Sequence, residues 1–132
     1  MSEKLTEGEE ILFRQVHPNF LDGGEPSSQT FMPTPKDENK LSVDRSAFTT
    51  AKESYALFAA NGYLSAAVYG VTVEEFASED IACKADPLKA SQEQKANVAH
   101  AFADYSPHGT NQQKNKAKRI KRKALARGLL HP

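Results

Sequence analysis

Residues 27–45 constrain the fold of this chain more than any other stretch, because they favour neither a helix nor a strand. The stretch opens on two serines, contains Pro33, Pro35 and a turn-like polar run, and ends in a short apolar segment. Proline donates no backbone hydrogen bond and so interrupts regular structure. A long ordered loop in a small domain is commonly functional. We therefore expect residues 27–45 to carry part of a binding site and residues 41–43 to form a short strand.

The chain has 132 residues, enough for one domain with a core and too few for two ordinary domains. Cys83 is the only cysteine, so no internal disulfide can form and a reducing cytoplasm is expected. No long apolar run is present, and the acidic N-terminus lacks the apolar core of a signal peptide. We expect a cytoplasmic protein without a membrane partner. Residues 1–9 are predicted to be flexible and residues 10–132 to form a single domain.

A formal net charge of zero hides a division along the chain. Residues 1–104 carry 9 basic and all 17 acidic residues, a balance of −8. Residues 105–132 carry 8 basic residues and no acidic one, a balance of +8. Such asymmetry indicates nucleic acid or an acidic partner, or alternatively a basic segment that docks on its own acidic body.

The pattern of apolar residues predicts an α+β domain with a mostly antiparallel sheet. The expected strands are residues 11–17, 41–43, 66–71, 81–85 and 98–104. A central helix is expected over residues 50–61, with a capping box that begins at Thr50, and a second capping box at Thr72 opens a short helix. Alanines alternate with larger residues in the last strand, so another element is expected to pack closely on their face.

A basic C-terminal helix is predicted over residues 112–127, capped by Thr110 or Asn111 and ended by Gly128. Its apolar stripe is thin and consists of Ala117, Ile120 and Ala124. The candidate contacts with nucleic acid or an acidic partner are Lys114, Lys118, Arg119, Lys121, Arg122 and Lys123. The helix has no aromatic residue, so its cations are expected to neutralise phosphates without stacking on bases. The alternative is a solvated helix docked on its own domain.

The candidate ligand-binding residues are Arg14, His17, Ser28, Asp37, Ser42, Arg45 and His100. Arg14 lies within an apolar strand, and a buried guanidinium requires an anion because an unpaired buried charge is costly. Asp37 or Asp104 could pair with Arg14 internally, or a ligand anion could do so. No metal-binding spacing such as His-Glu-x-x-His is present, so we expect neither a metal nor another cofactor.

No Gly-x-Ser-x-Gly motif is present, so Ser27, Ser28 and Ser42 are interpreted as hydrogen-bonding loop residues and not as nucleophiles. Cys83 lies in an alanine-rich stretch and is interpreted as a small core residue.

Several segments together resemble a family of small uncharacterised bacterial proteins. They are Arg14-Gln15-Val16-His17-Pro18, Ser28-Gln29 with Phe31, Pro33-Thr34, Lys36-Asp37, Leu41-Ser42-Val43, His100-Ala101 and the basic end that closes on Ala126-Arg127-Gly128-Leu129-Leu130. This resemblance implies no particular activity. Arg14 and Ser27-Ser28 are also loosely similar to ADP-ribosyltransferase-type toxins, whose fold places an arginine on the first strand and a catalytic glutamate on a late strand. The late strand here carries Asp104 in place of that glutamate.

We therefore expect a small bacterial binding or accessory protein that contacts a protein or nucleic-acid partner through residues 27–45 and 112–127. One alternative is an enzyme with an anion-binding cleft around Arg14, His17 and Ser28, such as an NAD-consuming transferase or a phosphoesterase. Another is a non-specific nucleic-acid binder. An open pocket lined by Arg14, His17, Ser28 and Ser42 would favour the enzyme or ligand-binding interpretation, and an Arg14 closed off by an internal carboxylate would weaken it.

Overall fold

A five-stranded antiparallel sheet organises the computed structural model, which describes residues 3–132. The strand order is β5-β1-β4-β7-β6. The strands are β1 (Ile11–Val16), β4 (Lys40–Arg45), β5 (Ala67–Thr72), β6 (Ala82–Ala85) and β7 (His100–Asp104). The short strands β2 (Leu21–Asp22) and β3 (Glu25–Pro26) pair separately as a hairpin. The predicted α+β fold is confirmed, although β7 begins two residues later than expected because residues 98 and 99 form a turn.

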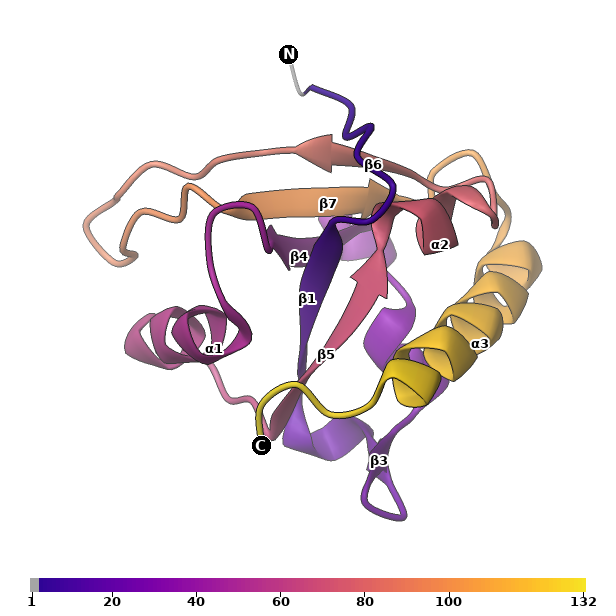
Figure 1. The fold of residues 1–132 in the computed structure, drawn as a ribbon, viewed down its shortest axis with the longest axis horizontal. Helices are drawn as coiled ribbons and strands as arrows, with labels where there is room; N and C mark the ends of the chain where they lie inside the picture. The colour runs from indigo at the N-terminus through magenta and orange to yellow at the C-terminus, as the bar shows by residue number, and fades with distance from the viewer. Residues whose placement is uncertain (1–2) are drawn as a thin grey trace.

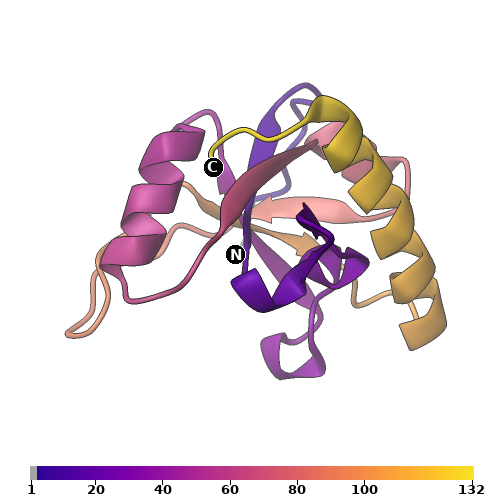
Figure 2. The same ribbon diagram turned by 90° about the horizontal axis from the view of Figure 1, so that it is seen from below.

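Three α-helices accompany the sheet: α1 (Ala51–Ala60), α2 (Val73–Ala77) and α3 (Thr110–Arg127). Helices α1 and α3 lie on opposite sides of the sheet (Figures 1 and 2). The Thr50 hydroxyl caps α1 by accepting the Glu53 N–H, and α2 opens on the predicted capping box. The predicted cap of α3 at Thr110 or Asn111 is wrong. Its N-cap is Gly109, which has no side chain to cap the helix; the Gly109 N–H donates to the Gln112 side chain, so the glutamine satisfies the N-cap N–H alone.

The hydrophobic core lies between the sheet and α3. The inward residues of three neighbouring strands are all buried, namely Leu12, Val16, Leu41, Val43, Ala101 and Ala103. The predicted apolar stripe of α3 is buried as well: Ala117, Ile120 and Ala124 are each at most 1% exposed. The small side chains on β7 therefore face the core, as their alternation indicated.

The middle of the 27–45 stretch belongs to this core. Two 3-10 helices, η2 (Ser28–Phe31) and η3 (Pro35–Asp37), form within the stretch that was predicted as a long ordered loop. Thr30 and Phe31 are fully buried, η2 packs against α3, and the Tyr105 hydroxyl donates to the Phe31 carbonyl oxygen at 2.6 Å. This part of the stretch is structural, and its strand β4 is longer than predicted.

Residues near both ends of the chain cover the two edges of the sheet. Along β6, the Leu5 N–H donates to the Cys83 carbonyl oxygen, and Leu5 is buried. Along β5, the Leu130 N–H donates to Val68, which in turn donates to His131. Covered edges protect a sheet from pairing with other chains. Of the segment 1–9 predicted to be flexible, residues 1 and 2 lie outside the described residues; the flexibility of the rest stays a prediction.

Candidate functional site

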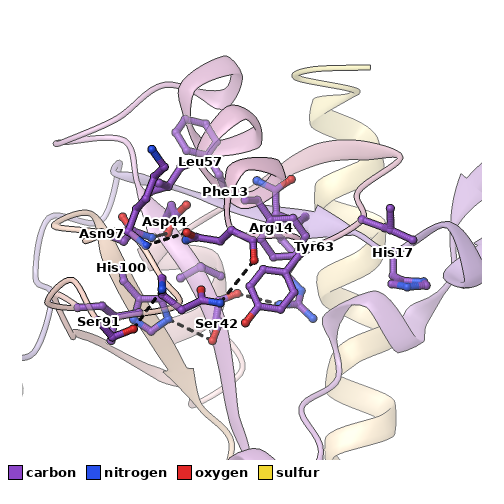
Figure 3. A pocket seen from close by; sticks show the side chains of 18 of the residues that line it. Phe13, Arg14, His17, Ser42, Asp44, Leu57, Tyr63, Ser91, Asn97 and His100 are labelled. Atoms are coloured by element: carbon purple, nitrogen blue, oxygen red, sulfur yellow. Dashed lines mark hydrogen bonds between the residues drawn. The ribbon is translucent and has the colours of Figure 1, made fainter.

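An open cavity of about 540 Å³ lies on the face of the sheet opposite α3. Its floor comes from β1, β4 and β7, one wall from the C-terminal half of α1, and the other wall from residues 88–97 (Figure 3). Asn61 ties the two walls together, because its side-chain oxygen accepts the Lys95 N–H at 2.8 Å. We call this cavity the α1 pocket.

Aromatic and aliphatic side chains form one side of the α1 pocket. They include Phe13, Phe20, Leu57, Phe58, Tyr63 and Leu64. The rings of Phe58 and Tyr63 stack with centroids 5.0 Å apart. Tyr63 and Leu64 are 50% and 66% exposed, so the mouth of the pocket presents apolar surface to solvent. An exposed apolar wall beside convergent polar groups is typical of a ligand-binding site.

A chain of hydrogen bonds crosses the floor beneath α1. Gln15 donates from Nε2 to the Ser54 hydroxyl at 2.9 Å, and that hydroxyl donates to Asp44 Oδ2 at 2.6 Å. Asn97 donates to the other oxygen of Asp44 at 2.8 Å. Gln15 Oε1 is buried and accepts no hydrogen bond from the described residues. These hydrogen bonds hold four polar side chains, which come from four segments, in one arrangement.

His100 connects three segments on the same floor. Its Nδ1 lies 2.9 Å from the backbone oxygen of Asp86 and 3.3 Å from the Asp86 carboxylate, and its Nε2 lies 3.1 Å from Ser42 Oγ. Both groups at Nδ1 are acceptors, which places the proton of the neutral ring on Nδ1 and leaves Nε2 to accept from Ser42. Ser42 is exposed on the pocket side, whereas the His100 side chain is only 14% exposed.

Arg14 lies where β1 and β4 stop pairing. The register between these strands covers Leu12 and Phe13, and the next residue, Arg14, instead donates from Nη1 to the Ser42 carbonyl oxygen at 3.0 Å. Its Nε donates to the Thr30 carbonyl oxygen at 2.7 Å. No carboxylate among residues 3–132 lies within 4.0 Å of this guanidinium, and Arg14 is one of the residues that line the pocket.

The charge of Arg14 persists at neutral pH. Burial lowers the pKa of Arg14 to about 10, and the nearby Tyr105 and Asp37 oppose that change. The group is therefore a partly buried cation whose direct partners are neutral carbonyl oxygens.

The structure brings four of the seven predicted ligand-binding residues together: Arg14, His17, Ser42 and His100 line the α1 pocket. The other three do not line it. Ser28 lies on η2, Asp37 accepts from Thr34 at 2.9 Å, and Arg45 forms a two-point ion pair with Glu10 at 2.9 and 3.0 Å.

Sequence reasoning missed Asp44, Ser54, Asp86 and Asn97. Strand alternation carries part of the signal, since Asp44 is two residues from Ser42 and must share its face. The remainder depends on register and on loop geometry, neither of which the residue pattern reveals.

Helix α3 is docked in part on the acidic body. Arg119 donates to Glu79 at 2.7 Å, Lys116 donates to the Glu79 carbonyl oxygen, and Arg127 pairs with Glu75. The cations of α3 without an acidic partner within 4.0 Å among the described residues include Lys114, Lys118, Lys121, Arg122 and Lys123. The ion pairs of Arg119 and Arg127 support a basic helix docked on its own acidic body, and the cations without an acidic partner support contact with nucleic acid or an acidic partner.

Cys83 is a core residue, as predicted: it is 1% exposed, and burial raises the pKa of its thiol to about 12. Among residues 3–132, no three His, Cys, Asp or Glu side chains are grouped so that they could hold a metal ion. Within the same residues, no helix combines the length and apolar character needed to cross a membrane.

Comparison of the chain with protein-family models, curated proteins and solved structures gives no match.

Proposed function

We propose that the protein binds a small ligand in the α1 pocket, and that the ligand combines an apolar body with an anionic or oxygen-rich end. The observation that carries this proposal is Arg14. Two of its N–H groups donate to backbone oxygens, and the other three of a guanidinium's five find no acceptor among residues 3–132. A ligand oxygen bound there would offset part of the desolvation of this cation.

The charge of the pocket supports the same ligand. Its lining contains Arg14, Lys89 and Lys95 but only one carboxylate, Asp44, whose oxygens already accept from Ser54 and Asn97. The pocket is therefore cationic although residues 1–104 carry a net charge of −8. A local potential opposite to that of the surrounding surface concentrates anions at the site.

The apolar wall defines the other end of the ligand. The stacked Phe58 and Tyr63 and the neighbouring Leu57 offer a flat apolar surface. Aromatic or aliphatic groups gain roughly 25 cal/mol for each Å² of apolar surface that they bury. Aromatic carboxylates, short fatty acids and nucleotides each combine an apolar or aromatic body with an anionic end. NAD, which is a dinucleotide, and phosphate esters that carry an apolar group have the same two parts.

The test is a thermal-shift series with benzoate, butyrate, AMP, NAD and inorganic phosphate. A ligand that binds only the folded state raises the melting temperature. We expect stabilisation by at least one amphipathic anion, and we expect Arg14→Gln to abolish it. Arg122→Gln is the matched control, because this arginine is exposed on α3 and lies outside the pocket lining.

A second pair of variants protects the test against misfolding of Arg14→Gln. Lys89 and Lys95 are exposed, so Lys89→Gln and Lys95→Gln should leave the fold intact and weaken anion binding. Stabilisation that survives all three pocket substitutions, or no stabilisation by any of the five compounds, would overturn the proposal.

A second role is supported by the unpaired cations of α3. We propose that they contact a polyanion or an acidic protein surface, as the exposed face of α3 presents Lys118 and Arg122 without acidic partners among residues 3–132. Affinity for a short single-stranded RNA should fall steeply as salt rises. Lys118→Gln with Arg122→Gln should weaken it, whereas Lys52→Gln, an exposed substitution on α1, should not. Affinity that is insensitive to salt or to the α3 pair would contradict this role.

A further inference from the structure

Two side chains on the pocket floor, Ser42 and His100, and the neighbouring Asp86 have the arrangement of a nucleophile, its base and the group that orients the base. We infer that Ser42, His100 and Asp86 form a catalytic constellation for the hydrolysis of a carboxylic ester. This inference rests on the proposal that the α1 pocket is the ligand site, and it names what happens to the ligand there.

The geometry meets the requirement for activation of a serine. Ser42 Oγ lies 3.1 Å from His100 Nε2, within the distance over which a base takes the proton of a nucleophile. Asp86 fixes the other ring nitrogen through its backbone oxygen at 2.9 Å and its carboxylate at 3.3 Å. Ser42 is exposed to the pocket, so its oxygen is accessible to a bound carbonyl carbon.

The register shows that His100 does not simply pair with its direct neighbour. Asp44 is the residue opposite His100 in the β4–β7 ladder, and Ser42 is opposite Phe102. Diagonal neighbours in a ladder are also within reach of an aromatic side chain. Here Ser54 and Asn97 occupy that carboxylate, and the ring of His100 reaches diagonally to Ser42.

Arg14 supplies positive charge beside the nucleophile. Its Nη1 donates to the backbone carbonyl oxygen of Ser42, so the guanidinium lies beside the backbone of the residue whose hydroxyl attacks the ester. Stabilisation of developing charge by fixed donors in a partly desolvated site is commonly the largest single contribution to catalysis. The apolar wall of Leu57, Phe58 and Tyr63 then receives the acyl or alkyl group of the ester.

The reaction needs only the ester and water. Ser42 Oγ attacks the carbonyl carbon while its proton passes to His100 Nε2, and the carbonyl oxygen becomes an oxyanion. The bond to the alcohol oxygen breaks, and the alcohol leaves with the proton from His100. Water then attacks acyl-Ser42, with His100 taking and returning one proton, and releases the carboxylic acid.

The experiment uses the full chain with an alkyl fluorophosphonate and with p-nitrophenyl butyrate. Intact mass should show one phosphonyl group per molecule, located on Ser42 by peptide mapping and absent from Ser42→Ala. Hydrolysis of the ester should fall to the uncatalysed rate in Ser42→Ala and by roughly 10²–10⁴-fold in His100→Gln. Ser106→Ala is the control, because Ser106 is exposed and lies outside the pocket lining; it should label and hydrolyse as the wild type does.

Asp86 is a positioning residue, and its role is tested separately. Asp86→Asn should slow phosphonylation without reducing its final extent, and Asp86→Glu should restore much of the rate. A purely structural role would instead lower the melting temperature and leave the labelling rate of the folded fraction unchanged.

Two results separate this inference from the proposed function. Ligand stabilisation in the thermal-shift series should persist in Ser42→Ala, because that substitution removes the nucleophile and leaves Arg14 and the apolar wall. If ligands stabilise the wild type but neither reagent reacts with Ser42, the pocket binds without catalysis and the inference is overturned. Labelling that persists in Ser42→Ala overturns it as well.

Discussion

The two faces of the same sheet differ in what their side chains do. Toward α3, the strands present Leu12, Leu41 and Ala101, all buried in the core. On the opposite face, residues of the same strands form a polar floor, in which Ser42 is exposed and His100 only partly buried. Because successive side chains of a strand point to opposite faces, core residues alternate with Phe13, Gln15, Ser42 and Asp44 of the pocket. Arg14 is an exception: it has the parity of Leu12 and lines the pocket where β1 and β4 stop pairing. Stability and ligand binding can therefore be changed separately by neighbouring substitutions.

The helices that cover the two faces differ in the same way. Helix α3 buries an apolar stripe against the sheet, whereas Ser54 is the one residue of α1 that is buried. Helix α1, which contacts the sheet through the Ser54 hydroxyl, therefore buries less apolar surface than α3, which packs Ile120 and its neighbours against the sheet. The polar face is left partly uncovered, and the α1 pocket occupies the open part.

The largest expected effect is on the core face. Phe31 is fully buried beneath α3, so Phe31→Ala should lower the free energy of unfolding by about 3–5 kcal/mol. Urea denaturation measures this value. Leu64→Ala removes an exposed side chain from the pocket mouth and should change stability by at most about 0.5 kcal/mol. Similar losses in the two variants would contradict the division between the faces.

Phe31 also shows where sequence reasoning succeeds and where it fails. Alternation and capping residues predicted the strands, the helix α1 with its Thr50 cap, and the buried stripe of α3, because each depends on residues close together in the sequence. The 27–45 stretch has no such periodicity. Its prolines indicated a long ordered loop that carries part of a binding site, yet η2 packs into the core. Sequence reasoning missed η2 and η3 because 3-10 helices of three or four residues leave little sequence pattern.

The pocket was predictable only in part. The apolar neighbours of Arg14 marked it as an unusual cation, and His100 stood out within an alternating strand. The contact of His100 with Ser42 depends on the β4–β7 register, which pairs residues 56 or more positions apart in sequence. Asp86 directly follows β6 and precedes Pro87, and no local pattern shows that it lies beside His100.

An intermediate effect is expected where α3 meets the edge of the sheet. Arg127 donates to Glu75 at 2.8 and 3.1 Å and to the Gly70 carbonyl oxygen at 2.8 Å. Arg127→Gln leaves a partly buried carboxylate without its cation, and should cost about 1–3 kcal/mol at neutral pH. Arg122→Gln, which breaks no ion pair among residues 3–132, should change stability by at most about 0.5 kcal/mol.

The Arg127 effect should depend on pH. Burial alone would raise the pKa of Glu75, but hydrogen bonds from Arg127 and Thr72 outweigh burial and hold that pKa below its usual 4.5. A carboxylate with a lowered pKa contributes stability above its unfolded pKa and loses it as the pH falls through its folded pKa. The difference between wild type and Arg127→Gln should therefore shrink below pH 4.5. The measurement should run from about pH 7 to about pH 3, an interval in which carboxyl groups titrate. A difference in stability that stays constant over this interval would show that the ion pair is not its source.

The smallest of these effects on stability is expected on the polar floor, and it carries the most information about the site. Ser54→Ala removes the hydroxyl between Gln15 and Asp44 and leaves a carboxylate oxygen of Asp44 with one donor fewer. We expect a loss of about 1–2 kcal/mol in urea denaturation, because Ser54 is 1% exposed and solvent replaces the lost bonds poorly. The same substitution should weaken ligand stabilisation more than Leu64→Ala does, since Asp44 anchors Asn97 and the wall of residues 88–97.

A double-mutant cycle of Ser54→Ala with Asp44→Asn tests whether these residues act together. The stability losses of the single variants should not add if one series of hydrogen bonds links the residues. Additive losses of stability would mean that the contacts on the pocket floor are independent of one another. If ligand binding were also unchanged, the polar face, like the core face, would contribute to stability alone.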